Sequence, residues 1–334
     1  MQRIKTIAIL SIILFQLPVL NISAQVSSKE QSSLSGKIIC IDPGHGGSAA
    51  LDTYRQSASG EREEWIDLRV ALLLKEMLEK KGAKVLLTRS SDVPVPLAER
   101  SKIAIDNRAD FFLSIHHNAT ADSTVNFPII YYHGLASENQ AGVVFSKYLS
   151  KTIQKYMYQT KTPVSVVSDF TIFSAAGSSV LRGSYGIPGV LAEASLFTNP
   201  GEEKRLKTRE HNYNEALAFC KAIEKFFKGT VPPILAKTSA KFPPQFTTLQ
   251  EAERMSPVAR RWHQDYTEGK ELMKSKDKES LQKAYDLFTQ SARSFPDSYV
   301  AAKCHTYRVV LLRKLGKEDE ALQEEIRVKE FYPK

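Results

Sequence analysis

Short apolar runs alternate with segments of helical spacing over residues 37–227, and this alternation is the feature that most limits the fold. The first apolar run, residues 37–41, ends at the turn residues 42–44, as is typical of a buried strand. From Glu63 to the stop at Gly82, apolar side chains recur three and four residues apart, as is typical of an amphipathic helix. Strands that alternate with helices predict an α/β fold, a mixed and mostly parallel sheet flanked by helices on both faces.

The remaining elements of the sheet follow the same alternation as far as residue 227. The expected strands lie at 84–87, 111–116 and 127–132, with late strands at Leu181 and at 189–192. The expected helices lie at 98–107, 141–156 and 210–227. Together these elements predict one α/β domain over residues 36–229.

A proline-rich stretch at 230–257 separates this domain from a region of different composition. Repeated prolines favour extended chain over packed elements, so we predict a linker there. Residues 258–334 are helix-forming and charged. Ala284 and Ala321 begin similar segments about 37 residues apart, close to the period of stacked helix-turn-helix repeats. We predict a small all-α domain that resembles tetratricopeptide repeats, with a plain helical bundle as the alternative.

Residues 1–24 have the pattern of a signal peptide. Two basic residues precede an apolar run at 7–20, and Ala24 supplies the small residue of a cleavage position. This run is shorter than the ~20 residues of a transmembrane helix, so no stable membrane span is expected after cleavage. The prediction is an exported protein of the periplasm or cell envelope, with a flexible lead-in at 25–35.

The chain carries a formal charge of +9. Excess positive charge favours anionic polymers, and an exported protein meets the acidic cell wall rather than nucleic acid, although a solvated basic surface gives the same count. Cys40, Cys220 and Cys304 are scattered and form no CxxC motif, so neither a disulfide framework nor a cysteine metal site is expected.

Four histidine and glutamate positions carry the chemistry: His45, Glu63, His116 and Glu193. His45 stands between glycines just after the first strand, and His116 and Glu193 stand at the ends of later strands. Ligands collect at the carboxyl ends of strands in open α/β sheets, so these side chains are expected to converge, with Glu63 reaching the same edge from its helix start. Two imidazoles and a carboxylate predict a zinc site with one open position.

Glu193 has a different expected role. An apolar strand delivers it to this edge, where burial raises the pKa of a carboxylate and suits it to proton transfer. We predict that Glu193 takes a proton from water and passes it to the leaving amine of an amide that zinc polarises.

Two choices between neighbouring residues follow from geometry and spacing. Adjacent strand residues point to opposite faces, so only one of His116 and His117 meets the metal, and spacing favours His116. Glu63 is favoured over Glu61 and Glu64 at the helix start. The other histidines lack partners at ligand spacing and are predicted to be ordinary surface or core residues: His133, His211, His263 and His305.

Several ordered motifs resemble the zinc-dependent N-acetylmuramoyl-L-alanine amidases that open with DPGHGG, over roughly residues 37–227. The motifs are the DPGHGG turn at 42–47, the helix from Glu63, Thr88-Arg89, the SIHHNA run at 114–119, Val180-Leu181-Arg182, the strand at 188–193 and Thr198-Asn199-Pro200. The resemblance implies that His45, Glu63 and His116 bind zinc and that Glu193 is the catalytic carboxylate. The implied reaction cleaves the amide between N-acetylmuramic acid and L-alanine of peptidoglycan.

Two further expectations concern the substrate contacts and the need for an activator. Asn118 and Arg182 are expected to contact substrate, with a structural salt bridge as the alternative for Arg182. Relatives often carry lysine where Glu64 stands, and the segment between Asn118 and Phe127 is too short for the long regulatory helix of some relatives. The site is therefore expected to be open without an activator.

Residues 258–334 are expected to bind a partner protein, since helical repeats present a concave surface. Their deletion is then expected to spare hydrolysis in vitro. A non-catalytic cell-wall-binding protein and a metallopeptidase that cuts within the stem peptide are the competing functions.

Overall fold

The computed structural model describes residues 32–47, 56–173, 176–238, 242–249, 251–254 and 256–334. The predicted signal peptide at 1–24 lies outside the described residues, and so does most of the predicted lead-in at 25–35. Leu34 is already fully buried, so the core begins just before the expected domain boundary at residue 36.

The described residues form a six-stranded sheet with the order β2-β1-β3-β6-β4-β5. All neighbouring strands pair in parallel except β4 and β6, which pair antiparallel. The sheet is therefore mixed and mostly parallel, as predicted. The strands are β1 (Ile38–Pro43), β2 (Lys84–Leu87), β3 (Phe111–Asn118), β4 (Ile129–Tyr132), β5 (Ser165–Ser168) and β6 (Gly189–Leu196).

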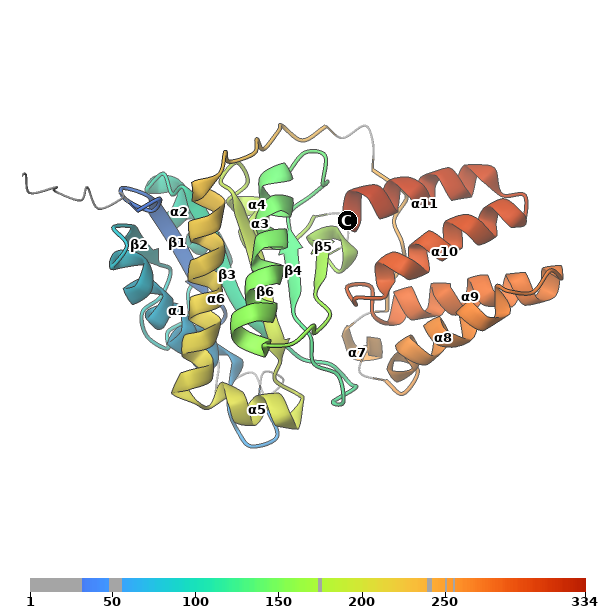
Figure 1. Cartoon of the computed structure of the whole chain (residues 1–334), viewed down its shortest axis with the longest axis horizontal. Helices are drawn as coiled ribbons and strands as arrows, with labels where there is room; N and C mark the ends of the chain where they lie inside the picture. Colours follow the sequence, from blue (N-terminus) through green and yellow to red (C-terminus); the bar gives the residue numbers. More distant parts are fainter. Residues whose placement is uncertain (1–31, 48–55, 174–175, 239–241, 250, 255) are drawn as a thin grey trace, which may run out of the picture. The chain divides into compact units, whose positions relative to one another are not determined.

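Helices cover both faces of the sheet (Figure 1). In the part of the chain up to Lys228 they are α1 (Glu63–Glu79), α2 (Leu97–Asp106), α3 (Gln140–Thr152), α4 (Ser179–Gly183), α5 (Pro200–Leu206) and α6 (Arg209–Lys228). A π-helical turn (Ile153–Tyr158) extends α3, and a 3-10 turn (Asp169–Thr171) follows β5. The later helices are α7 (Glu251–Arg254), α8 (Trp262–Leu272), α9 (Lys278–Ser294), α10 (Ala301–Lys314) and α11 (Glu318–Phe331), with a 3-10 turn (Ala259–Arg261) before α8.

Alternation along β3 explains the two layers. Phe111 belongs to the cluster under α1, α3 and α6, and its ring centroid lies 4.3 Å from that of Phe145. Phe112 points to the opposite face and belongs to the cluster that includes Ala104 of α2 and Val180 of α4. Each residue therefore packs against a different helical layer, as the period of two along a strand requires.

Three details differ from the sequence expectation. Leu181, expected in a late strand, lies in the short helix α4, because Val180 and Leu181 share one buried helical face and a two-residue apolar run carries no periodicity. Strand β5 was not expected, since its four residues include two serines. Strand β6 continues three residues beyond Glu193, to Leu196, instead of ending at the carboxylate.

The helices after residue 257 pack on one another in sequence, which confirms the predicted helical character of this region. Gly269 of α8 lies against α9, where an added β-carbon would come 3.0 Å from the ring of Phe288. Ala284 of α9 is fully buried. These small residues permit close helix contact; the tetratricopeptide-like repeat itself stays a prediction.

This helical region shares a hydrophobic core with the sheet. One cluster of buried side chains extends from Phe112 of β3 to Phe331 and Tyr332. The ring of Phe127, just before β4, lies 5.5 Å from that of Phe295, and Tyr131 of β4 donates a hydrogen bond to Asp297. The helices thus cover the β4 side of the face that also carries α2 and α4.

The first part of the predicted linker, residues 230–238, contains no helix, and it is bonded to the α/β domain. The backbone of Leu235 donates to the carbonyl of Glu138 at 2.8 Å, and Ile234 bridges to Asn139. Tyr185 donates to the carbonyl of Leu235 at 2.8 Å. Within the described ranges, no helix is both long and apolar enough to cross a bilayer.

Candidate active site

The loop after β1 is built on a buried aspartate. Asp42 is 1% exposed and accepts hydrogen bonds from Thr88 (2.6 Å), Ser114 (2.8 Å) and Arg100 (2.8 Å). These donors come from the segment after β2, from β3 and from α2. The aspartate therefore fixes the end of β1 to its surroundings, three residues before His45.

The glycines of this loop are required by its conformation and by His116. An added β-carbon at Gly44 would lie 2.3 Å from Cε1 of His116, so only glycine leaves room for that ring. Gly46 and Gly47 have positive φ angles of 113° and 66°, which favour glycine. His45 itself has a φ of 53°, in the left-handed region that costs a non-glycine residue energy. The loop holds His45 in this conformation at the edge of the sheet.

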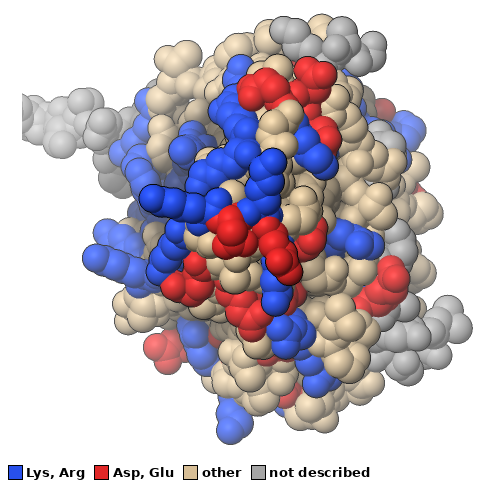
Figure 2. Space-filling model, turned by 90° about the vertical axis from the view of Figure 1, so that its right-hand side faces the viewer, with Lys and Arg blue, Asp and Glu red and all other residues tan. Residues whose placement is uncertain are grey.

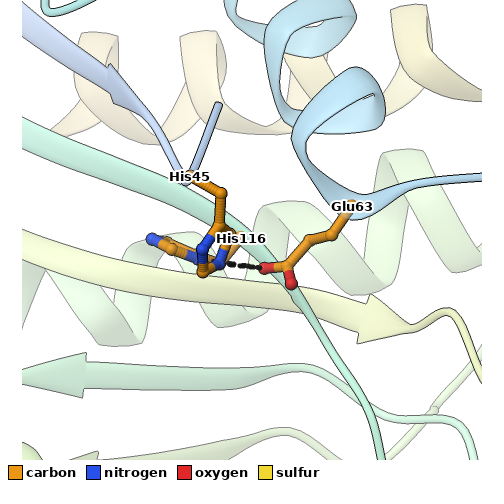
Figure 3. A group of neighbouring side chains, drawn as sticks. All are labelled: His45, Glu63 and His116. Atoms are coloured by element: carbon orange, nitrogen blue, oxygen red, sulfur yellow. Dashed lines mark hydrogen bonds and ion pairs between the residues drawn. The ribbon is translucent and has the colours of Figure 1, made fainter. Parts of the chain in front are cut away.

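His45, Glu63 and His116 come together as predicted (Figure 3). Their candidate ligand atoms all lie within 4.8 Å of one another. Oε1 of Glu63 lies 3.0 Å from Nε2 of His45 and 3.0 Å from Nδ1 of His116. Three residues from β3, the β1 loop and the start of α1 thus form a group that can hold a metal ion.

The electrostatics of this group favour a cation between the side chains. Burial opposes ionisation of Glu63, but the two histidines outweigh it and hold the pKa of Glu63 well below its usual range. Burial likewise opposes the charged form of His116, but Glu63 and Glu193 raise its pKa to about 9. A proton is therefore retained among these side chains, and a metal cation is suited to take its place. Two imidazoles and a carboxylate are a donor set that suits zinc.

The residues next to the candidate ligands in the sequence have other hydrogen-bond and ion-pair partners. His117 points to the other face of β3, where its ring nitrogens lie 2.8 Å from Asp67 and 3.1 Å from Glu215. Glu61 pairs with Arg69 at 2.7 Å. Of the alternatives weighed from the sequence, His116 and Glu63 are the ones that reach the group, and His117 is a buried partner of two carboxylates. Glu64, the other glutamate weighed at the helix start, forms an ion pair with Arg62 at 2.6 Å.

Glu193 lies beside the group on the adjacent strand. It is the register partner of His116 in the parallel pair β3–β6, so both side chains leave the same face of the sheet. Burial, followed by the charges of Glu63 and Asp67, raises the pKa of Glu193 to about 8 despite the opposing charge of His116. Its Oε2 is buried and accepts no hydrogen bond from the described residues. This oxygen is available to a water or a substrate.

Residues 39–225, more than half of the chain, match the sequence profile of the N-acetylmuramoyl-L-alanine amidases. The chain belongs to this amidase family. All of the side chains in the candidate site lie within the matched region, which we call the amidase domain.

Relatives and solved structures agree with this assignment. The probable cell wall amidase LytH of Staphylococcus aureus is 32% identical over 211 residues, which are 61% of this chain and 62% of LytH. The chain thus spans about three fifths of the length of this relative. The amidase AmiC2 of Nostoc punctiforme is 28% identical with a TM-score of 0.50, over 58% of this chain and 99% of AmiC2. The CwlD amidase of Clostridioides difficile, solved in complex with the GerS lipoprotein, is 26% identical with a TM-score of 0.50, over 58% of this chain and 99% of CwlD.

A groove of about 470 Å³ opens over the site of the amidase domain. His45 and His116 line it together with Leu191 of β6. Two further regions contribute to the lining, one within residues 94–100 and one made of Phe173 and residues 177–180. Residues 119–128, between β3 and β4, contain no helix, in agreement with the expectation of no regulatory insertion there.

The two residues predicted to contact substrate, Arg182 and Asn118, are not among the residues that line the groove. Arg182 is exposed and donates to the backbone carbonyls of Ala176 (2.9 Å) and Gly177 (3.0 Å). It therefore supports the backbone next to the groove, and it forms no salt bridge with any described residue. Asn118 lies at the end of β3, where its side-chain oxygen accepts from the backbone of Ala119 at 2.8 Å.

Two buried arginines of the amidase domain, Arg89 and Arg100, form hydrogen bonds with the loop that contains His45. Arg89 is 3% exposed and donates to the carbonyls of Pro43 (3.0 Å), Gly44 (2.6 Å) and Glu64 (2.7 Å), which ties the loop to the start of α1. Arg100 donates to the carbonyl of Pro43 at 2.8 Å and also to that of His45.

The sequence offers different signals for these two residues. Arg89 stands in the Thr88-Arg89 motif, whereas Arg100 lies in an ordinary amphipathic helix and has no sequence signal.

Proposed function

We propose that this chain is a zinc-dependent peptidoglycan hydrolase that cleaves the amide between N-acetylmuramic acid and the L-alanine of the stem peptide. The observation that carries the proposal is the convergence of His45, Glu63 and His116, with Glu193 beside them, inside the region that matches the amidase family. The activity, the zinc and the residue roles are proposals that rest on this geometry and on the family.

In this mechanism His45, Glu63 and His116 would hold the zinc. When bound there, it would polarise the scissile carbonyl and make water easier to deprotonate. Glu193 accepts the proton of the attacking water and delivers it to the leaving nitrogen, so that a neutral amine departs. Its raised pKa of about 8 suits the second step, because a carboxyl that binds a proton near neutral pH also gives one up there. Beside a cation at the three ligands, Glu193 would have a lower pKa and would therefore be ionised as the base of the first step.

Two competing functions share these residues. A metallopeptidase that cuts within the stem peptide also hydrolyses an amide, so the metal chemistry is common to both. A cell-wall-binding protein without activity has no use for a buried carboxylate oxygen that lacks a partner beside the ligands, and the oxygen of Glu193 therefore favours an enzyme.

We place the enzyme in the cell envelope. The support is the signal-peptide pattern of residues 1–24 and the cell wall amidase among the relatives. The formal charge of +9 suits an acidic polymer, and the predicted substrate is peptidoglycan.

The helices after residue 257 remain a proposed site for a partner protein. CwlD, solved with a lipoprotein, matches 58% of this chain, so its complex supports association of the amidase fold with another protein and does not by itself point to these helices. On the face drawn in Figure 2, basic and acidic side chains are interleaved. Separately from the figure, Arg313 of α10 and Glu325 of α11 form an exposed ion pair at 2.9 Å. A partner there would meet both signs of charge.

Digestion of purified sacculi tests the function. Residues 25–334 and the same protein with Glu193→Ala are incubated with sacculi, the products are identified by mass, and bound zinc is measured in both. Release of intact stem peptides by the wild type alone, with zinc in both, is the expected result. Peptide fragments would identify a metallopeptidase, and binding without release would identify a wall-binding protein or an enzyme that needs an activator.

A further inference from the structure

One side of the groove is formed by Phe173 and residues 177–180. Phe173, which is 44% exposed, lines the groove together with Gly177, Ser178, Ser179 and Val180. None of these residues belongs to the metal group. Their position therefore affects how a substrate lies in the groove, while the candidate ligands are held by other contacts.

A buried aspartate holds this segment in place. Asp169, which is 0% exposed, accepts a hydrogen bond from the backbone of Ser178 at 2.7 Å and one from Gly134 at 3.2 Å. Gly177 packs directly on the same carboxylate, since an added β-carbon there would lie 2.5 Å from Oδ2 of Asp169. The segment thus rests on one carboxylate that is shut off from solvent.

The aspartate is bonded in turn to a histidine and a lysine. Nδ1 of His133 lies 2.7 Å from Oδ2 of Asp169, and Nε2 of His133 lies 2.5 Å from Nζ of Lys237. An ammonium group only donates and a carboxylate only accepts. A neutral imidazole with its proton on Nδ1 therefore satisfies both neighbours, and it joins them in one chain of charge-assisted hydrogen bonds.

Lys237 comes from the proline-rich stretch, which is attached here. The next residue, Thr238, donates its backbone N–H to Oε1 of Glu138 at 2.6 Å and its hydroxyl to the same oxygen at 2.9 Å. Nζ of Lys237 also lies 4.7 Å from the ring centroid of Tyr185. These contacts fix the lysine on the amidase domain, far along the chain from the residues that line the groove.

We propose that Lys237, His133 and Asp169 are positioning residues that hold the 177–180 wall of the groove and thereby set the affinity for substrate. This inference rests on the proposed function, because it concerns the substrate of the same site. Lys237, a residue of the predicted linker, thereby contributes to substrate binding. Lys237 acts only through the wall, and the zinc ligands do not depend on it.

The test compares Lys237→Met with Lys237→Arg in the full protein, and the exposed Lys228→Met serves as a matched control. We measure bound zinc, thermal unfolding, and kcat and KM on a muropeptide. Lys237→Met is expected to lower kcat/KM by about ten- to a hundredfold, mainly through KM, with zinc content unchanged. Lys237→Arg, which keeps a charged donor, is expected to recover most of the loss, and Lys228→Met to behave as wild type. An unchanged KM in a folded Lys237→Met protein would overturn the proposal.

A second measurement does not depend on activity. Hydrogen exchange of the segment that contains the Ser178 amide is expected to become faster in Lys237→Met than in Lys237→Arg, because the carboxylate that accepts from this amide loses its support. If the wild type releases no stem peptide, the proposed function fails, but this exchange still decides whether the chain of contacts holds the wall. Equal exchange in both variants overturns the inference.

Discussion

The ring of His116 lies directly over the α-carbon of Gly44, so close that a β-carbon at residue 44 would come within 2.3 Å of Cε1 of the imidazole. Gly44 directly follows β1, and its backbone donates to the carbonyl of Ile115 at 2.9 Å, on the neighbouring parallel strand β3 that carries His116. The position of the His116 ring therefore depends on the absence of a side chain at Gly44. Of all nearby groups, this ring is the one that a side chain at residue 44 would displace first.

Gly44→Ala is expected to displace His116 and to lower zinc affinity by about ten- to a hundredfold, the usual size of a change in the support of a metal ligand. Bound zinc and competition with a chelator measure the effect. Gly229→Ala is the matched control, because its nearest contact would lie at 3.8 Å and its φ is negative. Wild-type zinc affinity in Gly44→Ala would show that the ring does not need this space.

Removal of zinc by a chelator is expected to abolish hydrolysis, and added zinc to restore it. His45→Gln and His116→Gln are each expected to remove a ligand and to leave less than one zinc per protein. His263→Gln, at an exposed position of α8, should keep both zinc and activity. Full activity of the chelated protein would rule out a metal mechanism.

Glu193→Gln is expected to lower kcat by about 10²- to 10⁴-fold, the range for loss of a general acid–base, while zinc stays bound. The amide has the shape of the carboxyl but accepts no proton from water. Turnover of a muropeptide and zinc content are the measurements, with the exposed Glu76→Gln as control. Loss of zinc together with activity would move Glu193 from proton transfer to ligation.

Much of this site could be predicted because its signals are local. The glycines around His45 mark a loop that approaches another side chain, and the period of two along β3 separates His116 from His117. The partners of the other histidines could not be predicted, since they come from distant parts of the chain. His133 meets Asp169 and Lys237, and His305, also expected to be ordinary, lies in the core bonded to Glu324.

Deletion of residues 258–334 is expected to destabilise the amidase domain and to reduce hydrolysis. This differs from the expectation drawn from composition, because the helices and the sheet share a core that includes Phe127 and Tyr131. In the full chain, Trp262→Ala is expected to cost about 3–5 kcal/mol, as for other buried aromatic residues. Denaturant unfolding measures both proteins. A truncated protein as stable and active as the full one would show that the domain does not need this cover.

The shared core could not be read from the sequence, for a physical reason. An amphipathic helix shows that one face is buried, but it does not show against what. The apolar face of α9 fits a helical partner and a sheet equally well, and Phe295 at its end in fact packs on Phe127.

Stability is expected to fall in acid partly through Glu324. Although burial opposes it, His305, Arg308 and Arg327 hold the pKa of this carboxyl well below its ordinary value of 4.5. A carboxyl with a depressed folded-state pKa contributes stability that is complete above its unfolded pKa and is lost as the pH falls towards the folded value.

Glu324→Gln should therefore lower stability near neutral pH and flatten its decline below about pH 4.5. Thermal unfolding from pH 7 to pH 3 measures this, with the exposed Glu320→Gln as control. An unchanged slope would place the acid sensitivity elsewhere.

The place of Phe331 and Tyr332 in the core has a consequence for the order of assembly. A chain is synthesised from its N-terminal end, so the strands that carry His116 and Glu193 are made well before the side chains that complete the cluster beside them. Until those last aromatic residues arrive, the face of β4 lacks its cover. A chain that ends before Phe331 therefore leaves buried side chains of β4 uncovered, and it is expected to be digested by proteases faster than the full chain.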